Sequence, residues 1–221
     1  MKKAVVLLSG GMDSAVTLYS AKQDYECHAL IFYYGQKADK ELTFAQKLAE
    51  DAGCEYIMMN ISFPWQGSAL LDEEVSIPRA SEASSTDGIP STYVPARNII
   101  FLSYGASYAE AIGAEAVFIG AHQLDFSNYP DCRRSFIDKF RQTIKEGTRR
   151  GHEGNEVKII TPIIDKTKKE IVELGMSLGV PFENTWSCYK NGKAPCGECE
   201  SCYFRIRAFQ EAGMKDPLMN Q

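Results

Sequence analysis

The stretch Lys3–Ser14, KAVVLLSGGMDS, decides the fold of this chain. Ala4–Leu8 is an unbroken apolar run, which predicts a strand buried on both faces inside a parallel sheet. Ser9-Gly10-Gly11 ends that run, and a helical apolar pattern then extends from Asp13 to about Gln23. A strand, a glycine turn and a helix start form a phosphate site, because the first N–H groups of the helix have no intrahelical partner. The two glycines also let the backbone approach a phosphate closely.

An ordinary strand-to-helix turn, with Asp13 or Ser14 as the N-cap, explains the glycines alone. A Walker A loop is excluded, because no lysine follows the glycines. The full string S-G-G-x-D-S is more specific and resembles the PP-loop of the N-type ATP pyrophosphatases. Those enzymes cut ATP between the α and β phosphates and pass AMP to a substrate oxygen. The resemblance implies an ATP site made of Leu8, Ser9, Gly10, Gly11, Met12, Asp13 and Ser14.

The composition is that of a soluble globular protein, with 44% hydrophobic and 24% charged residues among 221. A net charge of −5 argues against bulk electrostatic adhesion to nucleic acid or to an anionic membrane. The N-terminal apolar run is too short for a signal peptide, and no stretch approaches the ~20 apolar residues of a membrane span. We therefore expect a cytoplasmic protein.

Strand and helix patterns alternate along the chain. The expected strands after the first are 27–34, 55–61, 116–120 and 157–161, and the expected helices are 40–52, 97–111, 135–146, 167–178 and 203–212. This rhythm predicts an α/β fold with a parallel sheet of about five strands and helices on both faces. The expected fold is Rossmann-like and, from the resemblance of the PP-loop, similar to that of the adenine nucleotide α-hydrolases. We expect one PP-loop domain over 1–221, with residues 62–95 as an excursion or flap outside the core.

Polar clusters follow the expected strands or open the expected helices, where ligands bind in such sheets. Arg97 lies at a helix start, which is unfavourable unless an anion is near; a solvated arginine is the plain alternative. Asp125, Tyr129 and Asp131 lie in the loop from Gly120 to Arg133, which could hydrogen-bond a heterocycle or be a turn-rich connector. Lys168, after the expected N-cap Thr167, is placed to reach a pyrophosphate.

The three histidines and the basic stretch are less informative. We expect His28 to be a core residue and His152 to be solvated, and we leave the role of His122 open. Residues 133–150 hold seven Lys or Arg, which a solvated helix face explains more simply than nucleic-acid binding.

Four of the seven cysteines are close together near the C-terminus, as Cys188-x7-Cys196-x2-Cys199-x2-Cys202. In a chain without a secretion signal this spacing favours a metal over disulfides. Four thiolates suit a closed, structural zinc site in segment 181–212, and an iron–sulfur cluster is the main rival. Cys27, Cys54 and Cys132 fall outside the group, and we expect the first two in the core.

Several strings occur in the order found in 7-cyano-7-deazaguanine synthases: SGGMDS, YYGQK, STYVPARN, GAHQLDFSNYPDCR, TPIIDKTKKEI and the cysteine quartet. The resemblance runs from Lys3 to about Phe209. It implies a ligase that converts 7-carboxy-7-deazaguanine, ammonia and ATP to the nitrile, a precursor of queuosine in tRNA.

The same resemblance implies roles for individual residues. Ser9 to Ser14 and Lys168 would hold the polyphosphate with Mg²⁺, and Asp13 would help to place the metal. Asp125 and Asp131, with Tyr129 in the same loop, would bind the deazaguanine, and Arg97 its carboxylate or a phosphate. We expect a homodimer with no direct nucleic-acid partner and no membrane. A PP-loop enzyme that modifies tRNA and a zinc-stabilised binding module without chemistry are the alternatives.

Overall fold

The computed structural model describes residues 1–83, 88–122 and 129–219, so the predicted substrate residue Asp125 lies outside the described residues. Five strands form one parallel sheet in the order β3-β2-β1-β4-β5. They are β1 (Lys2–Leu7), β2 (Tyr25–Tyr33), β3 (Glu55–Asn60), β4 (Ala116–Phe118) and β5 (Lys158–Ile160). The predicted parallel α/β fold is confirmed.

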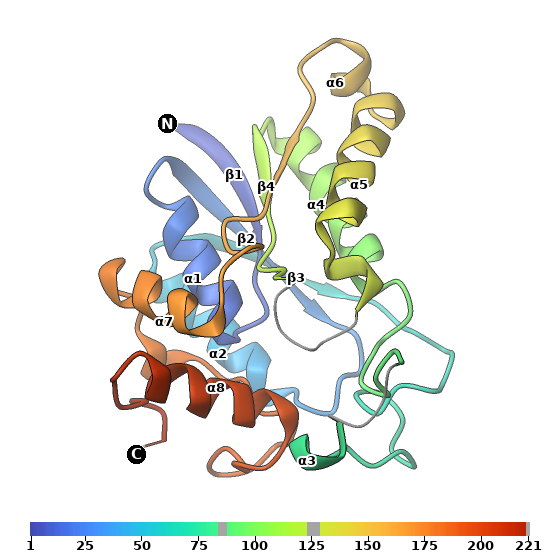
Figure 1. Cartoon of the computed structure of the whole chain (residues 1–221). Coiled ribbons are helices and arrows are strands. Elements are labelled where there is room, and N and C mark those ends of the chain that lie inside the picture. Colours follow the sequence, from blue (N-terminus) through green and yellow to red (C-terminus); the bar gives the residue numbers. More distant parts are fainter. Residues whose placement is uncertain (84–87, 123–128, 220–221) are drawn as a thin grey trace.

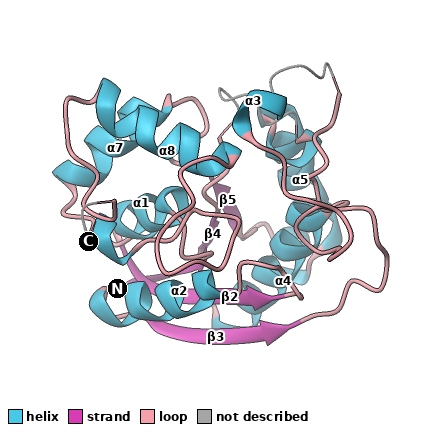
Figure 2. Cartoon of the chain, turned by 90° about the horizontal axis from the view of Figure 1, so that it is seen from below, coloured by secondary structure: helices cyan, strands magenta, loops and turns pink. Residues whose placement is uncertain are grey.

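Helices cover both faces of this sheet (Figure 1, Figure 2). One face carries α1 (Met12–Ala21), α2 (Lys40–Asp51), α7 (Lys168–Ser177) and α8 (Glu200–Glu211). The other face carries α4 (Arg97–Ile112) and α5 (Arg134–Gly147). The short helices α3 (Ala80–Ala83) and α6 (Arg149–His152) and the 3-10 turns Pro130–Cys132 and Phe182–Asn184 lie in connections.

Strand β1 supplies both cores, which explains its continuous apolar sequence. Ala4 and Val6 belong to the core under α1 and α2, whereas Val5 and Leu7 belong to the core under α4 and α5. Successive side chains of a strand point to opposite faces, so the part of β1 that is buried on both faces, Ala4–Leu7, is apolar at every position, and Lys2 and Lys3 lie at the less buried start of the strand.

Strand order places a crevice at the end of β1. The chain runs outward from β1 to β2 and β3, and then crosses back to β4, which pairs with the other side of β1. The connections after β1 and β4 therefore leave in opposite directions, and ligands bind where such connections separate.

Two expectations need correction. Residues 62–95 are not wholly outside the core, because Ala69, Leu70 and Val94 are buried. The last helix begins at Glu200 rather than Tyr203, with Cys199 as its N-cap residue, so Cys202 lies inside the first turn of α8. The sequence offers no conventional cap side chain before Glu200, so the pattern predicts a start that is three residues too late.

Other expectations agree with the structure. His28, Cys27 and Cys54 are buried, and His152 is exposed. The basic side chains of residues 133–150 lie mainly on the exposed side of α5 and α6, while Ile137, Phe140 and Ile144 face the core. None of the helices in the described ranges has the length and hydropathy that a membrane crossing requires.

Candidate active site

The loop after β1 has the geometry of a phosphate-binding turn. Gly10 takes a positive φ of 86°, and Gly11 is the N-cap residue of α1 with no side-chain cap. Ser14 Oγ accepts a hydrogen bond from Ser9 N at 3.2 Å and donates one to Gly11 O at 2.9 Å. This hydroxyl network holds the loop in shape and leaves the helix N-terminus without a side chain that would occupy an anion's place.

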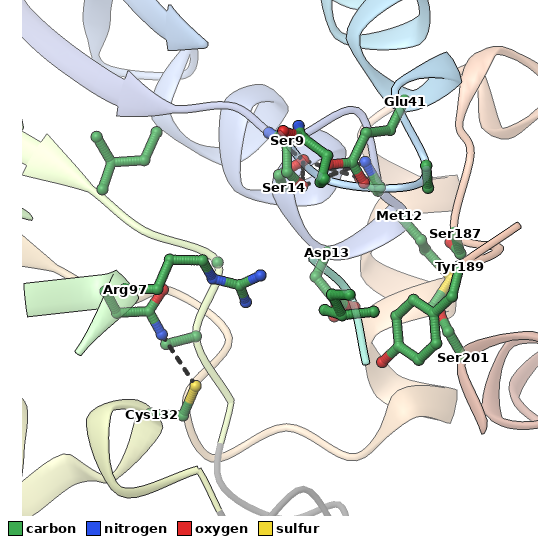
Figure 3. Close-up of a pocket in the computed structure, with 18 of the residues that line it drawn as sticks. Ser9, Met12, Asp13, Ser14, Glu41, Arg97, Cys132, Ser187, Tyr189 and Ser201 are labelled. Carbon is green, nitrogen blue, oxygen red and sulfur yellow. Dashed lines mark hydrogen bonds between the residues drawn. The ribbon is translucent and has the colours of Figure 1, made fainter. Parts of the chain in front are cut away.

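A pocket of about 300 Å³ lies against this loop. Figure 3 shows Ser9, Met12, Asp13 and Ser14 on one side of it and Arg97 on another. The predicted residues that line it are Leu8, Ser9, Gly11, Met12, Asp13, Ser14, Arg97, Tyr129 and Lys168.

Asp13, Lys168 and His122 meet beside the phosphate loop. Lys168 Nζ lies 2.6 Å from Asp13 Oδ2 and also contacts His122 Nε2, which is 3.4 Å from the same carboxylate oxygen. Burial alone would raise the pKa of Asp13, but Lys168 and His122 bring that pKa well below its usual range. Asp13 is thus a carboxylate at neutral pH, and its Oδ1 is buried with no hydrogen-bond partner among the described residues.

Lys168 is the first residue of α7. The predicted N-cap is confirmed, since Thr167 Oγ1 accepts from Glu170 N at 3.2 Å and Glu170 Oε2 accepts from Thr167 N at 2.7 Å. This capping box fixes the helix start. A cation in the first turn opposes the helix dipole, so the lysine does not stabilise the helix and serves the pocket instead.

Arg97 occupies a similar position at the start of α4. The residue before it, Ala96, has a φ of 56°, a left-handed conformation that costs a non-glycine residue about 1–2 kcal/mol. Tyr93 Oη accepts from Ala96 N at 2.9 Å, and Arg97 donates through Nη1 to Tyr34 Oη at 2.8 Å. The strained turn and these bonds hold the guanidinium at the pocket wall.

Asp131 does not line the pocket, and its carboxylate instead binds the backbone at the start of α4. Its Oδ2 accepts from Asn98 N at 3.0 Å, in the first turn of α4. Asp131 is 4% exposed, and burial raises the pKa of its carboxyl group. Its neighbour Tyr129 does line the pocket, with its hydroxyl 2.6 Å from Thr92 Oγ1. Asp131 therefore caps the helix that carries Arg97.

Glu41, in the first turn of α2, lines the pocket and was missed by the sequence reasoning. Its Oε1 accepts from Gln36 Nε2 at 3.1 Å. Burial raises the pKa of Glu41 to about 7, although Gln36 and Arg97 favour the charged form. Its place in the pocket depends on how α2 packs against the phosphate loop, and no sequence pattern reports that packing.

The four C-terminal cysteines form one cluster. The Sγ atoms of Cys188, Cys196, Cys199 and Cys202 all lie within 4.8 Å of one another. Backbone N–H groups of Lys190 and Cys196 donate to Cys188 Sγ at 3.3 and 3.4 Å, which favours a thiolate. Four converging sulfurs are the donor set of a tetrahedral metal site with no open position.

The segment that holds these cysteines also forms part of the pocket. Trp186 N donates to Gly10 O at 2.8 Å, so the segment is bonded directly to the phosphate loop. Its residues in the pocket lining are Trp186, Ser187, Tyr189, Glu200, Ser201, Phe204 and Arg205. Sequence reasoning treated the cysteines as a separate structural unit and missed this wall.

The phosphate loop, its place after the first strand of a parallel sheet and the pocket beside it define an α/β protein of the PP-loop class. The model of the family described as Queuosine biosynthesis protein QueC matches residues 3–213. The chain belongs to this family.

Curated relatives are similar over almost their whole length. The 7-cyano-7-deazaguanine synthase of Trichodesmium erythraeum is 48% identical over 98% of this chain and 100% of its own. The protein of the same name from Clostridium kluyveri is 49% identical over 99% of this chain and 97% of its own. Among solved structures, NMN synthetase from Francisella tularensis has a TM-score of 0.48 and 14% identity, over 97% of this chain and 78% of that one.

Proposed function

We propose that this protein is a ligase that forms carbon–nitrogen bonds, converting 7-carboxy-7-deazaguanine and ammonia to 7-cyano-7-deazaguanine with ATP. The product feeds the synthesis of queuosine. Membership of the queuosine family and relatives of that name at 48% and 49% identity support the reaction. The observation that carries it is the SGGMDS loop in the wall of a pocket that also holds Lys168 and Arg97.

The phosphate loop and Lys168 have the chemistry to bind the polyphosphate of ATP. The free N–H groups at the start of α1 are donors to phosphate oxygens, and the hydroxyls of Ser9 and Ser14 would become donors by giving up their bonds within the loop. Lys168 would exchange its contact with Asp13 for a phosphate oxygen. ATP arrives with Mg²⁺, which neutralises phosphate charge, and the orphaned Oδ1 of Asp13 is a suitable ligand for it.

A carboxylate resists attack by ammonia because its oxygen is a poor leaving group. Transfer of AMP from ATP to that oxygen breaks the bond between the α and β phosphates, releases pyrophosphate and gives an acyl-adenylate, which ammonia converts to the amide with release of AMP. A second adenylation, on the amide oxygen, lets that oxygen depart with AMP as the nitrile forms and two N–H protons are lost. The chain's part is mainly to align the carboxylate with the α phosphate and to stabilise charge.

Arg97 is the group we assign to the substrate carboxylate. Tyr34 and the start of α4 hold it in place, and Asp131 supports it through Asn98 rather than by touching the heterocycle. Tyr129 contributes a pocket surface, and Asp125 stays assigned to the heterocycle from its place in the sequence.

The cysteine cluster is assigned to one structural zinc ion. Zn–S bonds of about 2.3 Å in a tetrahedron place sulfur atoms roughly 3.8 Å apart, and Cys196 Sγ and Cys202 Sγ lie 3.9 Å apart. Four sulfur ligands leave no position for a catalytic water.

We also assign a homodimer, a cytoplasmic location and small-molecule substrates without direct nucleic-acid binding. The edge strand β3 supports the dimer, because Tyr56, Ile57 and Met58 are each more than a third exposed there. An edge with unpaired backbone groups and apolar side chains suits pairing with a second copy.

The test is product analysis. Purified protein with ATP, ammonia and the deazaguanine acid should yield the nitrile and AMP by mass spectrometry, with no effect of added tRNA. ADP and phosphate without AMP would overturn the mechanism. A strict need for tRNA would indicate a PP-loop enzyme that modifies tRNA instead.

A further inference from the structure

Two groups of opposite charge line the pocket from different helices. Glu41 comes from α2, beside the phosphate loop, and Arg97 comes from the start of α4. In Figure 3 the guanidinium of Arg97 extends toward the middle of the pocket, and Glu41 lies near Ser9 on another side. Neither forms an ion pair with any described residue.

Both groups are held in place by neutral partners. Gln36 is 6% exposed, and its amide is fixed because Oε1 accepts from Tyr34 N at 2.8 Å and Nε2 donates to Phe32 O at 3.1 Å. The same Nε2 donates to Glu41 Oε1, and the second oxygen of Glu41 has no hydrogen-bond partner among the described residues. The carboxyl group of Glu41 and the guanidinium of Arg97 are therefore both held in place in one pocket without forming an ion pair with each other.

Separated opposite charges in a partly buried pocket are costly unless a ligand complements both. The ligand must carry an anionic group for Arg97 and N–H donors for Glu41. A polyphosphate has no N–H donor to offer Glu41. The adenine edge pairs one amino donor with a ring nitrogen acceptor, so it offers an ionised carboxylate only one bond.

A 7-carboxy-7-deazaguanine molecule has both features. Its carboxylate is on one side of the fused ring, and the N1–H and 2-amino donors are on the other, adjacent to each other. We propose that Glu41 is a specificity-determining residue that accepts hydrogen bonds from this two-donor edge while Arg97 binds the carboxylate. The inference rests on the proposed function and adds to it the group that selects a guanine-type ring.

The charged form of Glu41 is the form that accepts both bonds, and Arg97 favours it across the pocket. A glutamine at the same place could accept one bond but would set its own N–H₂ against a donor. Hydrogen bonds to a charged group are worth about 1.5–3 kcal/mol each, so loss of one of the two bonds weakens binding about tenfold to a hundredfold.

The experiment measures equilibrium binding of the deazaguanine acid and, separately, of ATP. Glu41→Gln should bind the acid about tenfold to a hundredfold more weakly and bind ATP as the wild type does. Glu50→Gln is the matched control, because it makes the same change on an exposed part of α2. Loss of ATP affinity with unchanged acid affinity would overturn the proposal and assign Glu41 to the nucleotide.

An analogue supplies a second measurement that does not depend on the variant's folding. The acid without its 2-amino group should bind the wild type at least several-fold more weakly than the parent acid, and Glu41→Gln should bind the two about equally. Equal binding of both compounds by the wild type would overturn the proposal. If the wild type makes no nitrile and binds neither compound, the proposed function itself fails.

Discussion

Gly10 shows how one residue joins two parts of the site. A Cβ atom placed on it would lie 2.2 Å from Glu41 O and 2.9 Å from Ala45 N, in addition to the strain of its positive φ. The first turn of α2 therefore packs directly on the phosphate loop, and only glycine permits this approach. The same packing carries Glu41 to the pocket.

Replacing Gly10 by Ala should destabilise the protein by more than about 3 kcal/mol and abolish ATP binding, because strain and a backbone clash add. Gly35→Ala is the control: φ is +80° there, but nothing lies within 4 Å of an added Cβ. It should cost only about 1–2 kcal/mol. Urea unfolding measures the stability of the two variants, and titration with ATP measures their affinity for the nucleotide. Equal stability of the two variants would contradict the packing argument.

Asp131 offers a test between two roles. Asp131→Ala leaves the Asn98 N–H without its acceptor, which costs about 1–3 kcal/mol and loosens the start of α4 under Arg97. The Michaelis constant for the acid should rise more than that for ATP. Asp131→Asn keeps an oxygen acceptor and should restore most of the function. If Asn and Ala variants are equally poor in acid binding, Asp131 contacts the substrate directly.

The charge of Glu41 predicts a pH dependence of acid binding. With the pKa of Glu41 raised to about 7, most of its carboxyl groups are protonated at pH 6 and ionised at pH 8. Binding requires the ionised form, so affinity for the acid should fall about tenfold from pH 8 to pH 6. Of the groups facing it, Arg97 stays charged and Tyr34 neutral, since the pKa of Tyr34 is raised to about 12. The Glu41→Gln variant should lack this pH dependence. If the variant keeps the pH dependence, another group is responsible for it.

At the scale of elements, the sequence predicts those strands and helix ends that depend only on a few neighbouring residues. The apolar run of β1 and the N-cap residue Thr167 of α7 were predicted from sequence, because each is decided within a few residues, whereas the bond from Glu170 that completes the capping box was not predicted. The start of α4 has no cap of its own and is completed by Asp131 from a distant connection. Interactions between segments far apart in the chain leave no periodic pattern, so that role could not be predicted.

Loss of the metal from the cysteine segment should affect both the stability of the protein and the ATP site. Cys199→Ser should lower the melting temperature by about 10 °C or more, because a structural metal supplies much of the folding energy of such a segment. ATP binding should weaken with it, since Trp186 bonds to Gly10. Cys54→Ala, at a buried cysteine outside the cluster, should retain the metal and is the control.

Metal analysis separates the outcomes for Cys199→Ser. One zinc per wild-type chain is expected, and iron with sulfide in anaerobically prepared protein would contradict it. A well-folded variant that binds both ligands normally but is inactive would make the metal catalytic rather than structural.

At the scale of the molecule, the general position of ligands in parallel α/β sheets predicts where the pocket lies but not all of the residues that line it. Ligands lie beyond the carboxyl ends of the strands, and that rule brought Ser9, Arg97, Tyr129 and Lys168 to one place. The same rule does not predict Glu41 or Tyr189 in the pocket, because their positions depend on how α2 and the cysteine segment pack. These contacts follow from the whole fold rather than from any strand end.

The β3 edge predicts the state of association. Ile57→Lys introduces a charge at a position that is 39% exposed and should convert a dimer to a monomer in light scattering after gel filtration. Met176→Lys makes the same change on α7, where Met176 is 50% exposed, and should leave the dimer intact. A wild type with the mass of one chain would rule out the dimer, and an Ile57→Lys variant that stays dimeric would rule out this edge.

The order of the strands also has a consequence for synthesis on the ribosome. β1 needs β4 on its second side, yet β4 is made roughly a hundred residues after β1 ends. At ~5–20 residues per second, the central strand leaves the ribosome about 5–20 s before that partner exists. During this interval β1 and β2 can pair while the other edge of β1 stays open. Until β4 is made, the unpaired backbone groups of that edge are open to a chaperone or to pairing with another nascent chain.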